Sequence, residues 1–309
     1  MTGSKKVLGR RIRRYIPVYV LMLPGLLYLV INNFLPMFGL VIAFKDINFR
    51  KGIFGSDWCG LENFEFLFRT KDAWIITRNT ILYNIAFIIL GTIVAIFMAV
   101  LLSNVKRKIS LKFYQTAILL PHLVSWVIVA YIVYAFLSPE TGIFNKQLFP
   151  ALGLEPINWY TDKTWWPLIL IFMNIWKGTG YSSIIYLSSI LGISDEYYEA
   201  AMLDGASKIQ QITQITIPLL KPTIITMFIL SVGRIFYSDF GLFYQVPMNS
   251  GPLYSVTNTI DTYVFRGLLQ LGDIGMSSAA GFYQSIVGFL LVLASNAVIR
   301  KVSSENALF

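Results

Sequence analysis

The chain has 309 residues, of which 56% are hydrophobic and only 13% are charged, and its formal net charge is +9. Soluble domains typically carry about 25% charged residues, so this composition excludes an ordinary water-soluble globular domain. With a single cysteine, Cys59, and a single histidine, His122, the chain has no internal disulfide and is a poor candidate for a zinc site with the usual ligands.

Six apolar segments predict membrane-spanning helices, because a helix needs about 20 apolar residues to cross the hydrocarbon of a bilayer. The segments are 16–44, 77–102, 113–137, 165–191, 222–243 and 279–299. They lack the strict alternation of a barrel strand, and lipid-facing backbone must satisfy its own hydrogen bonds. The sequence therefore predicts an all-α polytopic membrane protein, organised as one transmembrane domain over residues 1–309.

The first segment follows a basic N-terminal cluster, yet it is too long for the apolar region of a signal peptide. No small-x-small cleavage site follows it, so we expect a retained signal anchor. The stretch Lys45–Ile76 comes next and is expected outside the cell. Within it, Phe64, Leu67 and Phe68 recur with the spacing of a short amphipathic segment at the membrane surface.

The distribution of lysine and arginine predicts the orientation. With both termini in the cytoplasm, 14 of the 25 basic residues lie inside and nine lie outside, where ten of the 16 acidic residues also lie. This bias follows the positive-inside rule. The net charge is then a signal of topology in a multi-pass cell-membrane protein, and it does not require a nucleic-acid partner.

Polar and ionisable side chains interrupt the fourth and fifth spans. Such residues are costly in a membrane and are functional-site hypotheses by default. Helical spacing places Asn174, Lys177 and Tyr181 on one face of the fourth span, and Ser231, Arg234 and Ser238 on one face of the fifth. Two interpretations stay open: these residues line a substrate path, or the two cations brace the bundle. His122, after Pro121 in the third span, is interpreted as a capping or interfacial residue.

The cytoplasmic loop 192–221 predicts a helix-turn-helix elbow. Ser194 is a suitable N-cap with acidic residues behind it, and Gly205 is a stop or a sharp bend. A second short helix is expected to end at Pro218 and Pro222, where the fifth span begins. Small side chains on such an elbow allow another protein to approach its backbone closely.

The loop also resembles a known motif. Glu199-Ala200-Ala201, Gly205 and Ile215-Thr216-Ile217-Pro218 are similar in type and spacing to the EAA motif of bacterial ABC-importer permeases, from which only Ile217, in place of leucine, departs. Looser similarities to the MalF/LplB-like branch of multiple-sugar and polysaccharide permeases cover most of the remaining chain. They lie at Leu23-Pro24-Gly25, Pro36–Gly39, Ala43–Asp46, Gly60–Phe64 and from Ala279 to Lys301.

The resemblance implies a type I ABC-importer permease fold in the inner membrane of a bacterium. In that family the elbow is a coupling helix seated in an ATPase subunit: Glu199 would pair with a basic residue, Ala200 and Ala201 would pack in a cleft, and Gly205 would form the turn. Asp204 and Pro218 complete the expected coupling set. The helices on either side of this loop would line the path, with Asn174, Lys177, Tyr181, Ser231, Arg234, Tyr237, Ser238 and Asp239 as candidates.

The same resemblance implies several partners. They are a second, different permease, two ATPase subunits, an extracellular binding protein and an oligosaccharide. The chain contains no Gly-x-x-x-x-Gly-Lys-Ser/Thr phosphate loop, so ATP and magnesium are expected on the ATPase partners, and this chain is expected to be non-catalytic and metal-free.

Alternatives to sugar import remain at this stage. They are an ABC permease for another solute such as an amino acid, a phosphate compound or a peptide; an ion-coupled secondary transporter, which predicts internal repeats; and a membrane enzyme, which predicts clustered catalytic side chains. Within sugars, two cations, Lys177 and Arg234, against one acid, Asp239, favour an acidic oligosaccharide such as one built of uronic acids.

Overall fold

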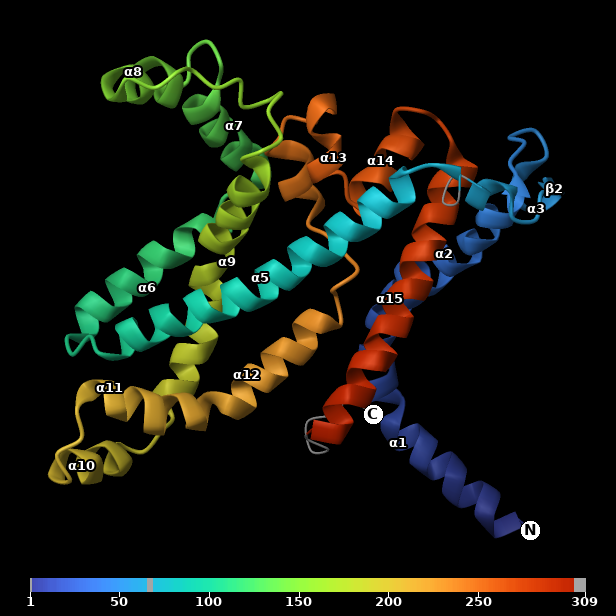
Figure 1. Cartoon of the computed structure of the whole chain (residues 1–309). Helices are drawn as coiled ribbons and strands as arrows, with labels where there is room; N and C mark the ends of the chain where they lie inside the picture. Colours follow the sequence, from blue (N-terminus) through green and yellow to red (C-terminus); the bar gives the residue numbers. More distant parts are fainter. Residues whose placement is uncertain (1, 66–68, 303–309) are drawn as a thin grey trace.

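The computed structural model describes residues 2–65 and 69–302, and these form an elongated assembly of helices (Figure 1). Within the described residues, five helical segments are long and apolar enough to cross a membrane, and a bent pair of helices makes a sixth if it counts as one span. The five are Tyr15–Phe44, Asp72–Ser103, Trp166–Leu191, Lys208–Val232 and Ile274–Ala297. The predicted all-α membrane fold is confirmed.

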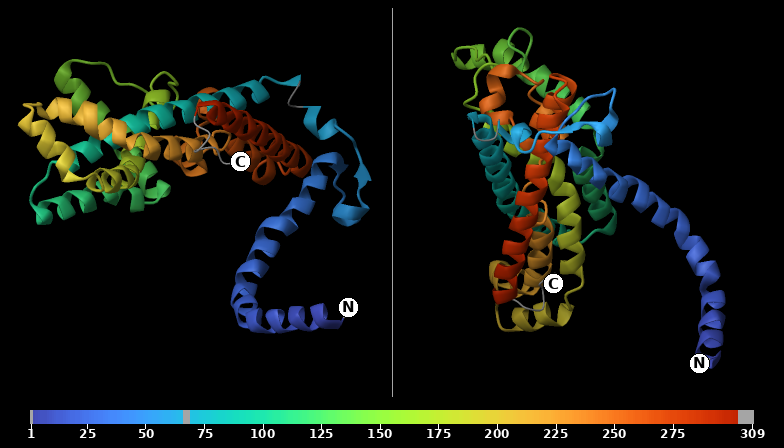
Figure 2. Two further views of the ribbon diagram at one scale, coloured as in Figure 1. Left: turned by 90° about the horizontal axis from the view of Figure 1, so that it is seen from below. Right: turned by 90° about the vertical axis from the view of Figure 1, so that its right-hand side faces the viewer.

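The N-terminal segment is one continuous helical rod. It runs through α1 (Thr2–Leu29), the π-helix η1 (Val30–Phe34), α2 (Leu35–Met37) and the 3₁₀-helix η2 (Phe38–Phe44). Figures 1 and 2 show α1 projecting away from the remaining helices. Leu21 on this rod is 82% exposed, and its neighbours along the helix are also exposed. Residues 15–38 of this rod therefore expose their apolar side chains to lipid or to another protein, whereas the last turns of the rod are partly buried.

A small hairpin follows the rod. Strand β1 (Lys45–Asp46) pairs antiparallel with β2 (Asp57–Trp58), with α3 (Gly52–Gly55) between them and the 3₁₀-helix η3 (Glu62–Phe64) after them. The Phe64 ring is 5.3 Å from Phe44 and 5.9 Å from Phe282, and it is buried. Phe64 thus packs inside the protein rather than on the membrane surface; Leu67 and Phe68, the rest of the predicted amphipathic pattern, lie outside the described residues.

Helices α5 (Asp72–Ser103) and α9 (Trp166–Leu191) pack along one another at the centre of the bundle. Ala95 and Ala99 on α5 are fully buried against a cluster that includes Tyr186 and Leu187 of α9. Small residues at such contacts let helix backbones approach closely in a membrane protein. These helices confirm the predicted second and fourth spans, and the second begins about a turn earlier than predicted.

The third span is not one straight helix, so the prediction of a continuous helix over 113–137 is wrong. Helix α6 (Lys108–Leu123) and helix α7 (Trp126–Leu137) meet at an angle of 92°. Val124 and Ser125 have extended backbone, and the Ser125 side chain accepts a hydrogen bond of 3.4 Å from the N–H of Ile128. A serine N-cap starts a new helix at this point, a signal that the apolar run concealed.

The fifth span differs from the predicted 222–243 at both ends. The helix runs without a stop through α11 (Lys208–Gln211), the π-helix η5 (Ile212–Thr216) and α12 (Ile217–Val232). Pro218 and Pro222 therefore do not end it. Pro218 lies in the first turn of α12, directly after the π-helical turn, where a missing N–H is tolerated. After Val232 the chain leaves the helix at Gly233.

Most of the remaining elements lie at two opposite ends of the bundle, and α15 runs between these ends (Figure 1). Helices α8, α13 and α14 gather at one end, whereas α10, α11, the N-terminus and the C-terminal end of α15 lie toward the other (Figures 1 and 2). Their bounds are η4 (Phe144–Leu148), α8 (Phe149–Leu152), α10 (Asp195–Leu203), η6 (Gly241–Gln245), η7 (Gly251–Leu253), α13 (Tyr254–Thr257), α14 (Ile260–Leu269) and α15 (Ile274–Val302). The sixth predicted span, 279–299, lies within α15.

Candidate functional site

The elbow of α10 and α11 is built by local hydrogen bonds. Ser194 accepts a bond of 3.4 Å from the N–H of Glu196, which confirms the predicted N-cap. Gly205 has φ +80°, its N–H donates to Met202 over 3.1 Å, and the N–H of Ala206 donates to Ala201 over 2.8 Å. This pair of bonds is a Schellman motif, which confirms the predicted stop at Gly205.

The second half of the elbow is fixed by features that sequence reasoning missed. Ser207 and Gln210 form a capping box, with bonds of 3.4 Å and 2.7 Å between each side chain and the other's N–H. The hydroxyls of Tyr198 and Thr216 share a bond of 2.9 Å that joins α10 to η5. The Ser-x-x-Gln spacing was a readable signal for this cap. The elbow is therefore rigid with respect to the span that follows it.

The predicted coupling residues lie on the accessible surface of this elbow. Glu199, Ala200, Asp204 and Gly205 are exposed, and Ala201 is half-buried. Pro218, also exposed, lies farther along the helix that follows. Behind α10 lies a polar pocket of about 430 Å³, and Glu199, Asp195 and Lys208 are among the charged residues that line it.

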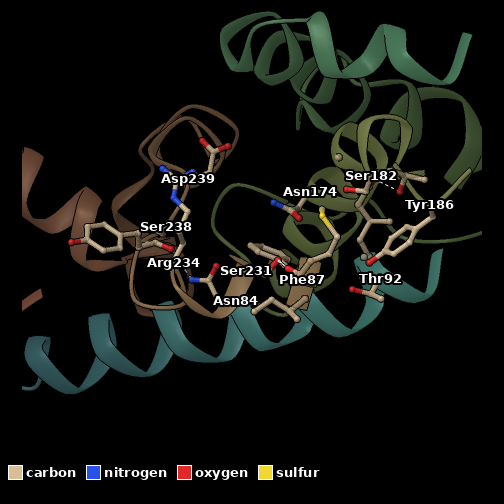
Figure 3. A pocket seen from close by; sticks show the side chains of 17 residues that line it. Asn84, Phe87, Thr92, Asn174, Ser182, Tyr186, Ser231, Arg234, Ser238 and Asp239 are labelled. Carbon is tan, nitrogen blue, oxygen red and sulfur yellow. Dashed lines mark hydrogen bonds between the residues drawn. The ribbon is translucent and has the colours of Figure 1, made fainter. Parts of the chain in front are cut away.

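A second cavity, of about 450 Å³ and lined by both polar and apolar side chains, lies between α5, α9, the end of α12 and the turn that follows it (Figure 3). Its lining residues are Asn84, Phe87, Ile88, Gly91, Thr92, Asn174, Ile175, Gly178, Thr179, Ser182, Tyr186, Met227, Ser231, Arg234, Tyr237, Ser238 and Asp239. Six of the eight predicted path residues are among them. Lys177 and Tyr181 are the two that are not.

The contribution of α5 to this cavity was missed from the sequence. Asn84 donates from its amide to the carbonyl oxygens of Thr80 and Tyr237, over 2.8 and 2.9 Å, and so ties α5 to the turn after α12. Asn84 and Thr92 are polar residues in an apolar span, two helical turns apart. That spacing was the available signal for a polar face on α5.

Arg234 supplies a cation at the cavity wall. It lies in a turn, where its N–H donates to the carbonyl of Ser231 over 3.0 Å, so the predicted helical face of Ser231, Arg234 and Ser238 does not form. The reason is that α12 ends at Val232, so Arg234 and Ser238 lie beyond the helix. The side chain is exposed, and no acid forms an ion pair with it in the described part of the chain. Figure 3 shows the Arg234 side chain on the same side of the cavity as Asp239.

Asp239 and Ser238 are engaged in the protein's own hydrogen bonds. Asp239 accepts from the indole N–H of Trp126 over 2.7 Å and from the N–H groups of Gly241 and Leu242 over 3.0 and 3.3 Å. The Ser238 hydroxyl donates to Asp261 over 2.6 Å. Of the charged groups that line the cavity, the guanidinium of Arg234 is thus the one not already paired.

Lys177 faces the break between α6 and α7. Its ammonium donates to the carbonyl oxygens of Pro121 and His122, over 3.2 and 2.8 Å, and to that of Val124. Tyr181 stacks on the His122 ring with 5.1 Å between centroids. The predicted shared face is therefore divided: Asn174 lies at the cavity, whereas Lys177 and Tyr181 contact α6.

Residues 91–304 match the family described as binding-protein-dependent transport system inner membrane component. The chain is similar to the protein LplB of Bacillus subtilis (strain 168), with 33% identity over 94% of this chain and 90% of the relative. It is equally similar, at 33% identity over 94% of this chain and 89% of the relative, to the polygalacturonan/rhamnogalacturonan transport system permease protein YteP of the same organism. A chain in the crystal structure of a bacterial ABC transporter involved in the import of the acidic polysaccharide alginate superposes with a TM-score of 0.86, at 32% identity over 96% of this chain and 99% of that chain.

Proposed function

The chain belongs to the family of binding-protein-dependent transport system inner membrane components, and on that premise we propose that it forms half of the path of an importer for acidic oligosaccharides. An extracellular binding protein would deliver the sugar to the end of the bundle that carries α8, α13 and α14. The protein is a multi-pass component of the cell membrane, and we infer that it is the inner membrane of a bacterium, with both termini in the cytoplasm.

The mixture of polar and aromatic side chains in this cavity supports a sugar as the substrate. Sugar hydroxyls need hydrogen-bond partners, and the cavity offers the amide of Asn174 and the hydroxyls of Thr179 and Ser182, while the rings of Phe87 and Tyr237 can cover the C–H faces of a sugar. The proteins named above include a permease protein of a polygalacturonan/rhamnogalacturonan transport system and a chain of an ABC transporter involved in the import of alginate. Both observations favour sugars over amino acids, phosphate compounds or peptides, and the family argues against a secondary transporter or an enzyme.

The unpaired guanidinium of Arg234 carries the proposal of an acidic substrate. Arginine recognises carboxylates with two parallel hydrogen bonds, which a neutral sugar cannot accept in the same way. Because Asp239 is held by the indole of Trp126 and by N–H groups at the start of η6, it forms no ion pair with Arg234 in the described structure, and the guanidinium is left free to bind a carboxylate of the ligand.

Energy would come from other subunits. The family dependence on ATP implies two ATPase subunits that hold ATP and magnesium, and a second, different permease that completes the path. The exposed Glu199 and Ala200 and the half-buried Ala201 of α10 fit a coupling helix seated on an ATPase, with Asp204, Gly205 and Pro218 shaping its support. Closure of the ATPases would move the elbow, and the capped, hydrogen-bonded connection to α12 would transmit that motion to the cavity.

Arg234→Gln tests the substrate. We expect uptake of trigalacturonate by cells carrying the whole importer to fall about tenfold or more, the size that a charge-assisted hydrogen bond contributes, while uptake of neutral galactotriose is retained. Arg234→Lys keeps the charge and serves as the control. An equal loss of both probes would remove charge selection from the proposal.

Glu199→Lys tests the coupling role. Reversal of the charge should prevent the ATPase subunits from copurifying with the permease, or should abolish the stimulation of ATP hydrolysis by loaded binding protein. Glu196→Lys, an exposed acid in the first turn of the same helix, is the matched control. Normal copurification and normal stimulation with Glu199→Lys would show that α10 does not couple through this residue.

A further inference from the structure

The break between α6 and α7 leaves carbonyl oxygens in the middle of a span. The last carbonyls of a helix have no partner within it, and in a membrane each one must find a donor. A lysine ammonium has three donor hydrogens, and Lys177 places one on each of the carbonyls of Pro121, His122 and Val124. The negative end of α6 also favours a cation. The charge of Lys177 is thus balanced by backbone and needs no acidic partner.

Trp126, the first residue of α7, connects this ammonium to the cavity wall. The face of its ring lies 5.3 Å from the Lys177 ammonium, and its indole N–H donates to Asp239 over 2.7 Å. A cation over the ring polarises the indole and strengthens it as a donor. Three elements, α9, α7 and η6, are therefore joined in one polar chain.

Asp239, the last member of that chain, decides whether Arg234 is paired. Arg234 and Asp239 both line the cavity, yet they form no ion pair in the described structure. A carboxylate free to turn toward a neighbouring guanidinium would pair with it, because such pairs are strong and directional. Asp239 does not turn, because one oxygen is held by Trp126 and the other by the N–H groups of Gly241 and Leu242.

We propose that Lys177 and Trp126 are positioning residues that hold Asp239 at the contact between α7 and η6, and so keep Arg234 unpaired for an acidic substrate. This proposal rests on the acidic-oligosaccharide function given above and assigns a specificity role to two residues outside the cavity. Lys177 itself does not touch the sugar.

The first experiment needs no substrate. The thermal unfolding midpoint of the purified importer is measured in two double-mutant cycles, each of which combines Arg234→Gln with Asp239→Asn. One cycle is made in the wild-type background and the other in the Trp126→Phe background, where a ring is kept but the N–H donor is removed. In the wild-type background, the changes in unfolding midpoint caused by the two substitutions should be additive. With Trp126→Phe, Asp239 is released to Arg234, and the two substitutions should become coupled.

The matched control background is Trp176→Phe on α9, because the indole of Trp176 makes no hydrogen bond in the part of the chain that the structure describes. In this background the effects of Arg234→Gln and Asp239→Asn on the unfolding midpoint should remain additive. Equal coupling in the wild-type and Trp126→Phe backgrounds would overturn the proposal. If Trp126→Phe does not assemble, Lys177→Met takes its place, with Lys177→Arg as the conservative variant expected to restore additivity.

The second experiment measures selectivity. Trp126→Phe should lower the ratio of trigalacturonate to galactotriose uptake about tenfold, and adding Asp239→Asn should restore it, because the competing carboxylate is gone. Suppose that the wild type prefers trigalacturonate and that Arg234→Gln removes this preference. An uptake ratio that Trp126→Phe leaves unchanged would then reject the positioning role while the proposed function stands. A wild type without any preference for the acidic probe would instead reject the acidic substrate, and the unfolding cycles would still decide whether the contact holds Asp239.

Discussion

Two basic residues predicted in membrane spans have different surroundings. Lys177 is saturated by three carbonyl oxygens at a helix break, whereas Arg234 is unpaired at a cavity wall. Both are cations within predicted spans, so the same two interpretations applied to each of them. What separates them is the acceptor geometry of the neighbouring chain, so at the scale of the residue the structure favours bracing for Lys177 and the path for Arg234.

Gly180 shows how closely two helices approach at one residue. A Cβ atom built there would lie 1.9 Å from the carbonyl oxygen of Ile118 on α6, so only a residue without a side chain fits. Gly180→Ala should force α6 and α9 apart and lower the thermal unfolding midpoint of the purified complex, by an overpacking strain of about 1–3 kcal/mol. Gly281→Ala on α15, where nothing lies within 4 Å, is the control and should leave the midpoint unchanged or slightly higher. Equal midpoints for the two variants would contradict this close contact.

At the scale of the element, the ends of helices decide the architecture more than their apolar runs do. A serine N-cap at Ser125 divides a run that is long enough to span, and a π-helical turn carries the fifth span past Pro218. The elbow is the exception that sequence alone described well, because its caps at Ser194 and Gly205 are local. Caps depend on neighbours in sequence, and breaks inside apolar runs depend on packing.

The end of α10 gives a prediction for this element. Gly205 has φ +80°, a conformation that asparagine tolerates and a β-branched residue does not. Gly205→Val should distort the elbow and reduce ATP hydrolysis stimulated by binding protein, while Gly205→Asn should retain most of it. The assay is steady-state ATPase activity of the reconstituted importer. Similar activity in the two variants would show that the left-handed turn is not needed for coupling.

At the scale of the whole molecule, the apolar surface of the isolated chain is unusually open. Helix α1 stands away from the bundle (Figure 2), whereas η2 packs on α15. An apolar groove of about 440 Å³ lies between α7 and α9. Exposed apolar area of this extent is stable in lipid or against another subunit. This exposed surface fits a chain that forms one part of a larger membrane assembly. Both ends of the chain lie toward the end of the bundle that carries the elbow (Figure 1).

The single cysteine tests this topology directly. Cys59 is half-buried beside the hairpin at the end opposite to α10, so it should react with a membrane-impermeant maleimide added to intact cells. A Cys59→Ser/Lys106→Cys variant carries its only thiol in the turn between α5 and α6 and should react only after the cells are opened. The reverse pattern of labelling would place both termini outside.

The sequence by itself determined the membrane class, the approximate spans and the coupling elbow, because these depend on local hydrophobicity, charge bias and motif spacing. The family comparison then confirmed the transport class, while the assignment of residues 1–309 to one domain and the roles of the coupling residues stay predictions. Only the tertiary structure decided that α5 joins the cavity wall, that α6 and α7 are bent by 92°, and that Lys177 and Arg234 have separate environments. The position of α5 and the environments of the two cations depend on groups that meet across more than 50 residues in sequence, as Lys177 meets Val124, and such contacts have no local signature. The bend has a local signal in Ser125, but the long apolar run around it conceals that signal.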